Sequence, residues 1–186
     1  MDILAAFGLS ASAGLNAYIP LLVVSLLARF TDLIVLSEPW NALESWWVIG
    51  VLVLLSVIEF FADKVPAVNH INDAIQTFIR PAAGAILFAA SATVITDISP
   101  IISIIAGLLV AGSVHAVKAV AVRPAITAST AGAGNLPVSI LEDAISTGLS
   151  VLSVALPILV GVVLLLSAIL ILWWLARRAK RMRDLS

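Results

Sequence analysis

Cysteine is absent from this chain of 186 residues. Its absence excludes disulfides, thiolate metal sites and cysteine-based catalysis. Charge is also scarce, because charged residues make up only 11% of the sequence and hydrophobic residues 62%. Soluble domains carry roughly 25% charged residues. A soluble fold would leave too little polar surface, so the composition predicts an integral membrane protein.

Enzyme signatures are missing as well. The sequence holds no His-Glu-x-x-His, G-x-S-x-G, Walker loop or G-x-G-x-x-G motif. Its two histidines, His70 and His115, lie far apart and have no ligand-like spacing. We therefore expect no enzyme, no cofactor and no metal centre. The net charge of -1 also argues against a nucleic-acid partner.

Long apolar runs predict an all-α, polytopic bundle of about six spans, since about 20 apolar residues in a helix cross the hydrocarbon core. The fifth and sixth could also form one helix kinked at Pro157. We expect a single transmembrane domain over residues 1–176 and a basic cytoplasmic tail over 177–186. The predicted spans are Ile3–Ala28, Trp46–Ala62, Ala82–Ile95, Ile101–Val117, Val138–Leu156 and Pro157–Ala176.

Basic residues predict the orientation of these spans. The tail "RRAKRMRDLS" carries five Lys or Arg residues directly after the last span, and such residues concentrate on the cytoplasmic side. Six spans then place Lys64, Arg80, Lys118 and Arg123 inside, and Asp97 and the 29–45 loop outside. We expect both termini in the cytoplasm and a bacterial inner-membrane location.

Two pairs of similar segments interrupt the apolar pattern. "PAVNHINDAIQT" (66–77) and "PVSILEDAIST" (137–147) both predict amphipathic helices with a polar stripe, and they leave internal duplication or chance open. "SAGLNAYIP" (12–20) and "TAGAGNLP" (130–137) predict broken helices, which a bilayer tolerates where they are buried or line a cavity. Asn16 and Asn135 would then be ligands beside free carbonyls, or satisfied packing residues.

Three stretches together resemble a known family. They are "GLSASAGLNAYIPLL" (8–22), "IEFFADKVPAVNHINDAIQTFIRPAAGAI" (58–86) and "STAGAGNLPVSILEDAISTGLSVLSVALP" (129–157). In combination they are similar to the bacterial membrane family catalogued as domain of unknown function four-one-two-six. The resemblance covers nearly the whole chain except the basic tail, and it implies no particular activity.

Carboxylates within or beside the spans are the candidate site. An acidic side chain at the bilayer centre costs about 2.5–3.5 kcal/mol, so Glu59 should have a partner, a wet cavity or a proton. We expect both amphipathic segments to fold inward from the cytoplasmic side and line one cavity. The candidate pathway residues are Asn16, Glu59, Asp63, Asp73, Asn135, Glu142 and Asp143; His70, Arg80, His115, Lys118 and Arg123 should stand near the mouth as proton relay or head-group contacts.

Three functions fit this pattern. The first is a small transporter or channel for a cation or small solute, with proton coupling through Glu59 and Glu142 as an option, since oxygen ligands suit hard cations. The second is a phospholipid or polyprenyl-phosphate flippase or scramblase that uses Arg80 and Arg123. The third is a non-transporting partner subunit. The expected partners are the lipid bilayer, a small ion or solute, and a second copy, because small bundles often dimerise.

Overall fold

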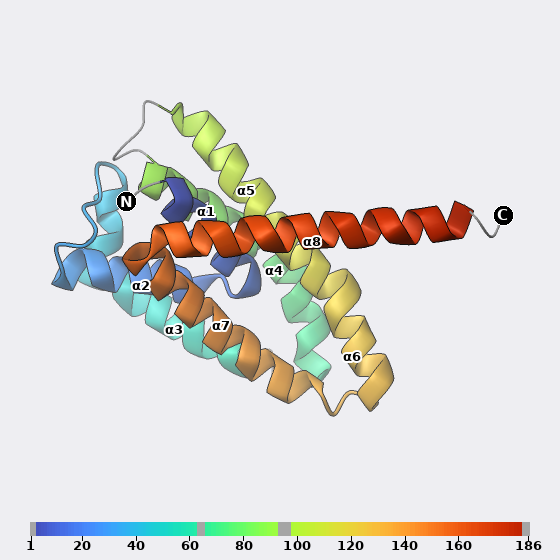
Figure 1. The fold of residues 1–186 in the computed structure, drawn as a ribbon. Helices are drawn as coiled ribbons and strands as arrows, with labels where there is room; N and C mark the ends of the chain where they lie inside the picture. The colour runs from blue at the N-terminus through green and yellow to red at the C-terminus, as the bar shows by residue number, and fades with distance from the viewer. Residues whose placement is uncertain (1–2, 63–65, 93–97, 184–186) are drawn as a thin grey trace.

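The computed structural model describes residues 3–62, 66–92 and 98–183. Within these residues every regular element is a helix, which confirms the predicted all-α class (Figure 1). The elements in chain order are α1 (Ile3–Leu15), α2 (Tyr18–Phe30), the 3-10 helix η1 (Trp40–Glu44), α3 (Trp46–Ala62), α4 (Pro66–Ala92), α5 (Pro100–Val117), the π-helical turn η2 (Lys118–Val122), α6 (Arg123–Thr130), α7 (Asn135–Ala155) and α8 (Pro157–Arg183).

Four helical stretches in the described part of the chain are long and apolar enough to cross a membrane, and they indicate a membrane protein. They are Ala74–Ser91, Pro100–Thr130, Asn135–Ala155 and Pro157–Trp174. Three further apolar helices, α1, α2 and α3, have 13, 13 and 17 residues. At about 1.5 Å per residue, 13 residues span only about 20 Å, less than the hydrocarbon core.

The first predicted span is in fact two helices, because α1 ends at Leu15 and α2 begins at Tyr18. The predicted break within residues 12–20 is thereby confirmed. Helix α1 forms the centre of the bundle and contacts α4, α5, α7 and α8. Its sequence of Gly, Ala and Ser allows this, since small side chains let neighbouring helices approach closely.

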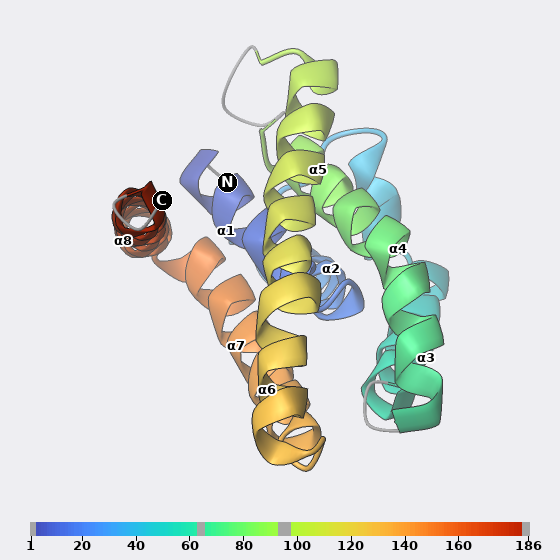
Figure 2. The same cartoon turned by 90° about the vertical axis from the view of Figure 1, so that its right-hand side faces the viewer.

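The fourth predicted span, Ile101–Val117, corresponds to α5, which ends at Val117, but the helical path does not stop there. The helical path continues through η2 into α6, so that α5, η2 and α6 form one long rod (Figure 2). Pro124 lacks the N–H group that would bond back into the preceding turn. The Arg123 N–H instead reaches the carbonyl of Lys118, five residues back, as in a π-helical turn.

The last two predicted spans are separate helices. Leu156 leaves helical geometry, with φ -138 and ψ 60, and Pro157 starts α8. Helix α8 turns back across the bundle and extends well beyond it, so that the described part of the basic tail is a helical continuation of the last span (Figure 1).

The two amphipathic helices face inward with their polar sides. In α4, Gln76 and Arg80 are buried, whereas Phe78 is 79% exposed. In α7, Ser146 is buried, whereas Leu141 is 57% exposed. This polarity is the reverse of a soluble bundle, and it suits a protein whose outer surface meets lipid.

Candidate functional site

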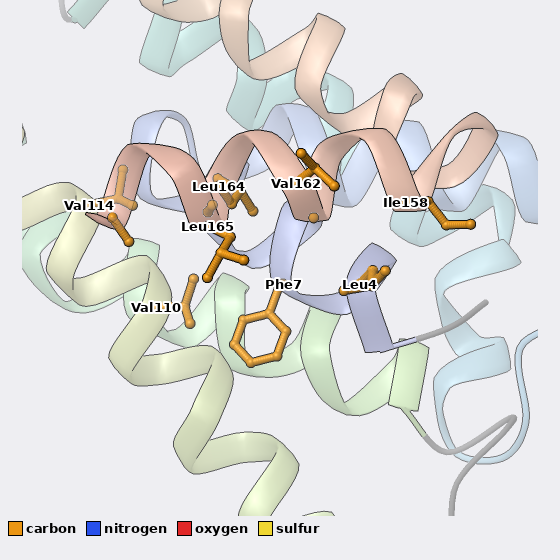
Figure 3. Close-up of a pocket in the computed structure, with 11 residues that line it drawn as sticks. Leu4, Phe7, Val110, Val114, Ile158, Val162, Leu164 and Leu165 are labelled. Atoms are coloured by element: carbon orange, nitrogen blue, oxygen red, sulfur yellow. The ribbon is translucent and has the colours of Figure 1, made fainter. Parts of the chain in front are cut away.

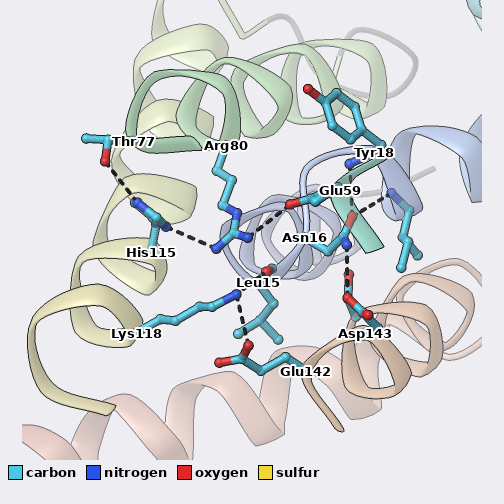
Figure 4. A network of polar contacts seen from close by, with 12 residues as sticks. Leu15, Asn16, Tyr18, Glu59, Thr77, Arg80, His115, Lys118, Glu142 and Asp143 are labelled. Carbon is cyan, nitrogen blue, oxygen red and sulfur yellow. Dashed lines mark hydrogen bonds and ion pairs between the residues drawn. The ribbon is translucent and has the colours of Figure 1, made fainter. Parts of the chain in front are cut away.

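The break between α1 and α2 lies inside the bundle, where its backbone groups need partners. Asn16 is only 1% exposed. Its side-chain oxygen accepts hydrogen bonds from the backbone N–H groups of Tyr18 and Ile19, at 3.1 and 3.0 Å. Its side-chain nitrogen donates to Oδ1 of Asp143 at 3.0 Å (Figure 4). Asn16 therefore links the start of α2 to α7.

The other end of the break is held by a lysine. The Leu15 carbonyl, at the C-terminal end of α1, accepts a hydrogen bond from Nζ of Lys118 at 3.0 Å. The same ammonium group lies 3.0 Å from Oε2 of Glu142. Arg123 Nη2 also contacts that oxygen, at 2.6 Å. One carboxylate on α7 thus receives two cations, one of which also binds the broken helix.

A second ion pair lies between α3 and α4. Arg80 Nη2 donates to Oε1 of Glu59 at 2.9 Å, and the two side chains are 0% and 1% exposed. The other terminal nitrogen of Arg80 lies 3.2 Å from Nδ1 of His115. His115 Nε2 lies 3.2 Å from the Thr77 hydroxyl. The partner that the sequence demanded for Glu59 is therefore Arg80.

The protonation state of His115 follows from these contacts. A guanidinium has only donors, so Nδ1 of His115 must accept the hydrogen bond from Arg80. The imidazole is then neutral, its proton is on Nε2, and Nε2 donates to the Thr77 hydroxyl. A proton on Nδ1 of His115 would face the N–H donor of Arg80, and the hydrogen bond between the two side chains would be lost.

We call the side chains of these contacts, with the Leu15 carbonyl, the polar network. Among the residues that the structure describes, its formal charges balance, because Arg80, Lys118 and Arg123 oppose Glu59, Glu142 and Asp143 while His115 is neutral. Buried charges are costly unless paired, and this pairing lets five buried charges and the half-buried Asp143 be accommodated in an apolar surrounding. The network residues are Asn16, Glu59, Thr77, Arg80, His115, Lys118, Arg123, Glu142 and Asp143.

Most candidates from the sequence meet in this network, but the basic ones occupy a different place than expected. Arg80, His115, Lys118 and Arg123 were predicted at a cavity mouth, and all four are buried. Each can be buried because a carboxylate or another polar side chain meets it. Asp63 lies outside the described residues, as do the side chains of His70 and Asp73.

Asn135 lies apart from the network, at the start of α7 and directly after the turn that joins α6 to α7. Its side chain pairs with the Thr127 hydroxyl at 3.0 Å. Ala131 and Gly132 adopt φ values of 51 and 89, which explains a glycine in this turn. The segment "STAGAGN" therefore has a local structural reason: it reverses the chain.

Serines that the sequence reasoning overlooked join α1 to its neighbours. The Ser12 hydroxyl lies 2.9 and 2.7 Å from the hydroxyls of Ser146 and Ser150 on α7. The Ser10 hydroxyl donates to the Gly84 carbonyl on α4 at 2.9 Å. The four-residue spacing of Ser146 and Ser150 is the signal that could have identified this face, because small residues so spaced mark close helix contacts.

Two hollows lie along α8, and both are lined mainly by apolar side chains. The first, of about 520 Å³, lies between α8, α1 and α5 and includes Phe7 and Val110 (Figure 3). The second, of about 690 Å³, includes Leu141 and Leu172 and also Lys118 and Glu142. We call the second hollow the α8 groove. It brings an apolar surface directly to one half of the polar network.

The chain belongs to a family whose members share one domain of unknown function. The family model described as "Domain of unknown function (DUF4126)" matches residues 3–178, nearly the full chain. This confirms the resemblance found in the sequence. Neither the curated proteins nor the solved structures gave a match.

Proposed function

We propose that this chain is a small membrane transporter, and that a cation or small solute passes through the polar network, with proton uptake by its carboxylates as a coupling step. The observation that carries this is the buried break between α1 and α2. Both of its ends are bound by side chains from other helices, Lys118 at one end and the Asn16–Asp143 pair at the other. Membrane transporters commonly place their sites at such discontinuous helices.

Stability alone does not account for the five buried charges of Glu59, Arg80, Lys118, Arg123 and Glu142. Replacing a buried ion pair by apolar residues of similar size is often neutral or stabilising, by about 1–4 kcal/mol. A bundle selected only for stability in a membrane would not need Glu59 and Glu142 in its interior. If the ion pairs of the polar network exchange partners, in contrast, a cation or proton can enter without giving the interior a large net charge.

We also propose the orientation that the basic tail favours, with both termini in the cytoplasm of a bacterial inner membrane. Because the native chain has no cysteine, single cysteines at Asp32 and Ser167 would report accessibility without background. Labelling of the Asp32 position from the cytoplasmic side would contradict this orientation.

The transport proposal is tested in proteoliposomes by a screen of monovalent and divalent cations across a pH series. Asp143→Asn is the informative variant, because an amide oxygen can still accept the hydrogen bond from Asn16 while the charge is lost. We expect it to remain monodisperse and to lose flux or its pH dependence. Asp32→Asn, at an exposed loop position, is the matched control and should keep wild-type flux. Wild-type flux in Asp143→Asn would remove Asp143 from the pathway.

A second candidate function is translocation of an anionic amphiphile, and the α8 groove favours it. The groove is a hollow of about 690 Å³ with a mainly apolar lining, and Lys118 lies on its wall. Ala168 lines both hollows, so Ala168→Trp should fill them and stop transfer of a fluorescent phospholipid without stopping cation flux. Ile169→Trp, whose position is 52% exposed, is the control. Phospholipid transfer in place of any cation flux would favour this second function.

A further inference from the structure

The ammonium group of Lys118 occupies a place built like a cation site. It lies 3.0 Å from the Leu15 carbonyl and 3.0 Å from the Glu142 carboxylate. The carbonyl stands at the C-terminal end of α1, where the helix dipole favours positive charge. Carboxylate and carbonyl oxygens are the ligands that hard cations take in proteins.

We infer that the side chain of Lys118 acts as a built-in substitute for a dissolved monovalent cation, and that an alkali ion binds between Leu15 and Glu142 when the ammonium is removed. The inference goes beyond the proposed function: in the wild-type chain the ammonium holds this one place, so the fold needs no sodium or potassium there for structure. Water reaching the site along the α8 groove, which Lys118 and Glu142 both line, would complete the coordination.

Arg123 serves a different purpose from Lys118, although both contact Glu142. Its Nη2 lies 2.6 Å from the carboxylate, and no contact that the structure gives for the described residues joins it to the Leu15 carbonyl. When Lys118 is removed, Glu142 still pairs with Arg123, and the net charge of that pair is near zero. We therefore expect one positive charge, and not two, to bind in the place that the ammonium leaves.

The charged groups around Lys118 limit what else could respond. Helix α7 contributes Glu142 and Asp143, the start of α6 contributes Arg123, and His115 lies one turn earlier on α5. Helix α1 has no ionisable side chain among its described residues. The carboxylate that the structure places on this ammonium is Glu142, so the response of a Lys118 variant to added cations should depend on Glu142.

The test is melting of purified Lys118→Ala in KCl, NaCl and choline chloride at constant ionic strength, with binding of radioactive rubidium as a second readout. We expect a saturable rise of about 3–6 °C at ten times the dissociation constant for an alkali ion, by mass action. Choline is too large and should give no rise. The wild type should respond to none of the three salts and should bind no rubidium.

Two variants serve as controls. Arg123→Ala removes a cation from the same carboxylate but keeps Lys118 on Leu15, so it should not respond. Lys118→Ala combined with Glu142→Gln should lose at least tenfold in rubidium affinity. If Lys118→Ala unfolds in choline, its monodisperse recovery in KCl should exceed that in choline at least threefold.

A folded Lys118→Ala that ignores all alkali ions, equal recovery in KCl and choline, or an equal response in Arg123→Ala would overturn the inference. These measurements use binding and stability alone. A wild type that transports nothing would thus refute the proposed function and leave this result standing.

Discussion

The α3–α4 and α6–α7 hairpins each bury one Glu–Arg pair, but they do so in opposite order. In the first hairpin the acid, Glu59, comes first and Arg80 follows on the second helix. In the second hairpin Arg123 begins the first helix and Glu142 follows on the second. The ends of α3 and α4 that approach each other lie at the same end of the bundle as the α6–α7 turn (Figure 2).

The stoichiometry of the two pairs also differs. Glu59 and Arg80 are 1% and 0% exposed, and the free side of Arg80 is held by a neutral His115. Glu142 instead takes both Lys118 and Arg123 and lines the α8 groove. Among the contacts given for the described residues, the first hairpin thus holds one carboxylate on one arginine, Glu59 on Arg80, which we call the closed pair. The second hairpin holds a carboxylate that can release one cation and keep another. We therefore expect the exchange of a bound cation to cost less free energy in the second hairpin than in the first.

The largest expected effect breaks the closed pair. Arg80→Met leaves Glu59 buried without its cation, which should cost about 3–5 kcal/mol of unfolding free energy. The melting temperature in a fixed detergent, followed by tryptophan fluorescence, should fall by more than about 6 °C. Adding Glu59→Leu should restore most of the loss, because both charges then disappear together. A single variant that melts like the wild type would show that the pair is not what holds α3 on α4.

A smaller effect is expected from the equivalent change in the second hairpin. Arg123→Met leaves Lys118 on Glu142, so the loss should be near that of one charged hydrogen bond, about 1.5–3 kcal/mol. Its melting temperature should lie between those of the wild type and Arg80→Met. If Arg123→Met proves less stable than Arg80→Met, the remaining Lys118–Glu142 pair does not compensate for the lost arginine. The expected difference between the two hairpins would then be wrong.

The two hairpins also differ in packing at one glycine on their second helices, α4 and α7. A Cβ on Gly84 of α4 would lie 2.8 Å from the Gly107 carbonyl and closer still to Ala111, so Gly84→Ala should cost about 1–3 kcal/mol. A Cβ on Gly148 of α7 would meet nothing within 4 Å. Gly148→Ala should therefore stabilise α7 by about 0.5–1 kcal/mol through helix propensity. Parallel melting curves measure both, and a loss in Gly148→Ala would indicate a contact at that face.

Much of the fold could be predicted from local sequence. Apolar runs identify the helices, the Gly14–Pro20 segment indicates a break, and the stripes of α4 and α7 identify amphipathic helices. The need of Glu59 for a partner follows from the cost of a carboxylate in lipid. These inferences succeed because each depends on residues close together in the chain.

The network itself depends on contacts that no local pattern encodes. The sequence around Arg80 and Arg123 does not indicate which arginine pairs with Glu59 and which pairs with Glu142. One partner of Lys118 is the backbone carbonyl of Leu15, and a backbone acceptor has no sequence signature. The apolar run that predicts a span ends at Val117, whereas a π-helical turn carries the helix on past Pro124. The similar segments "RPAAGA" (80–85) and "RPAITA" (123–128) lie on α4 and α6, which are different arms of their hairpins, so they support no simple duplication.

The smallest expected effect compares the two threonines of the repeated Asp-Ala-Ile-x-Thr segment. Thr77 on α4 accepts a hydrogen bond from the neutral His115, whereas the Thr147 hydroxyl on α7 bonds the Asp143 carbonyl within its own helix. Thr77→Val keeps the shape but removes the acceptor, so the Nε2–H of His115 loses its hydrogen bond to Thr77, at a cost of about 0.5–1.5 kcal/mol. Thr147→Val removes a bond at an exposed helix position and should change stability by no more than about 0.5 kcal/mol. Melting of both variants in the same detergent measures the difference. Equal behaviour of the two variants would mean that His115 contributes nothing to the closed pair.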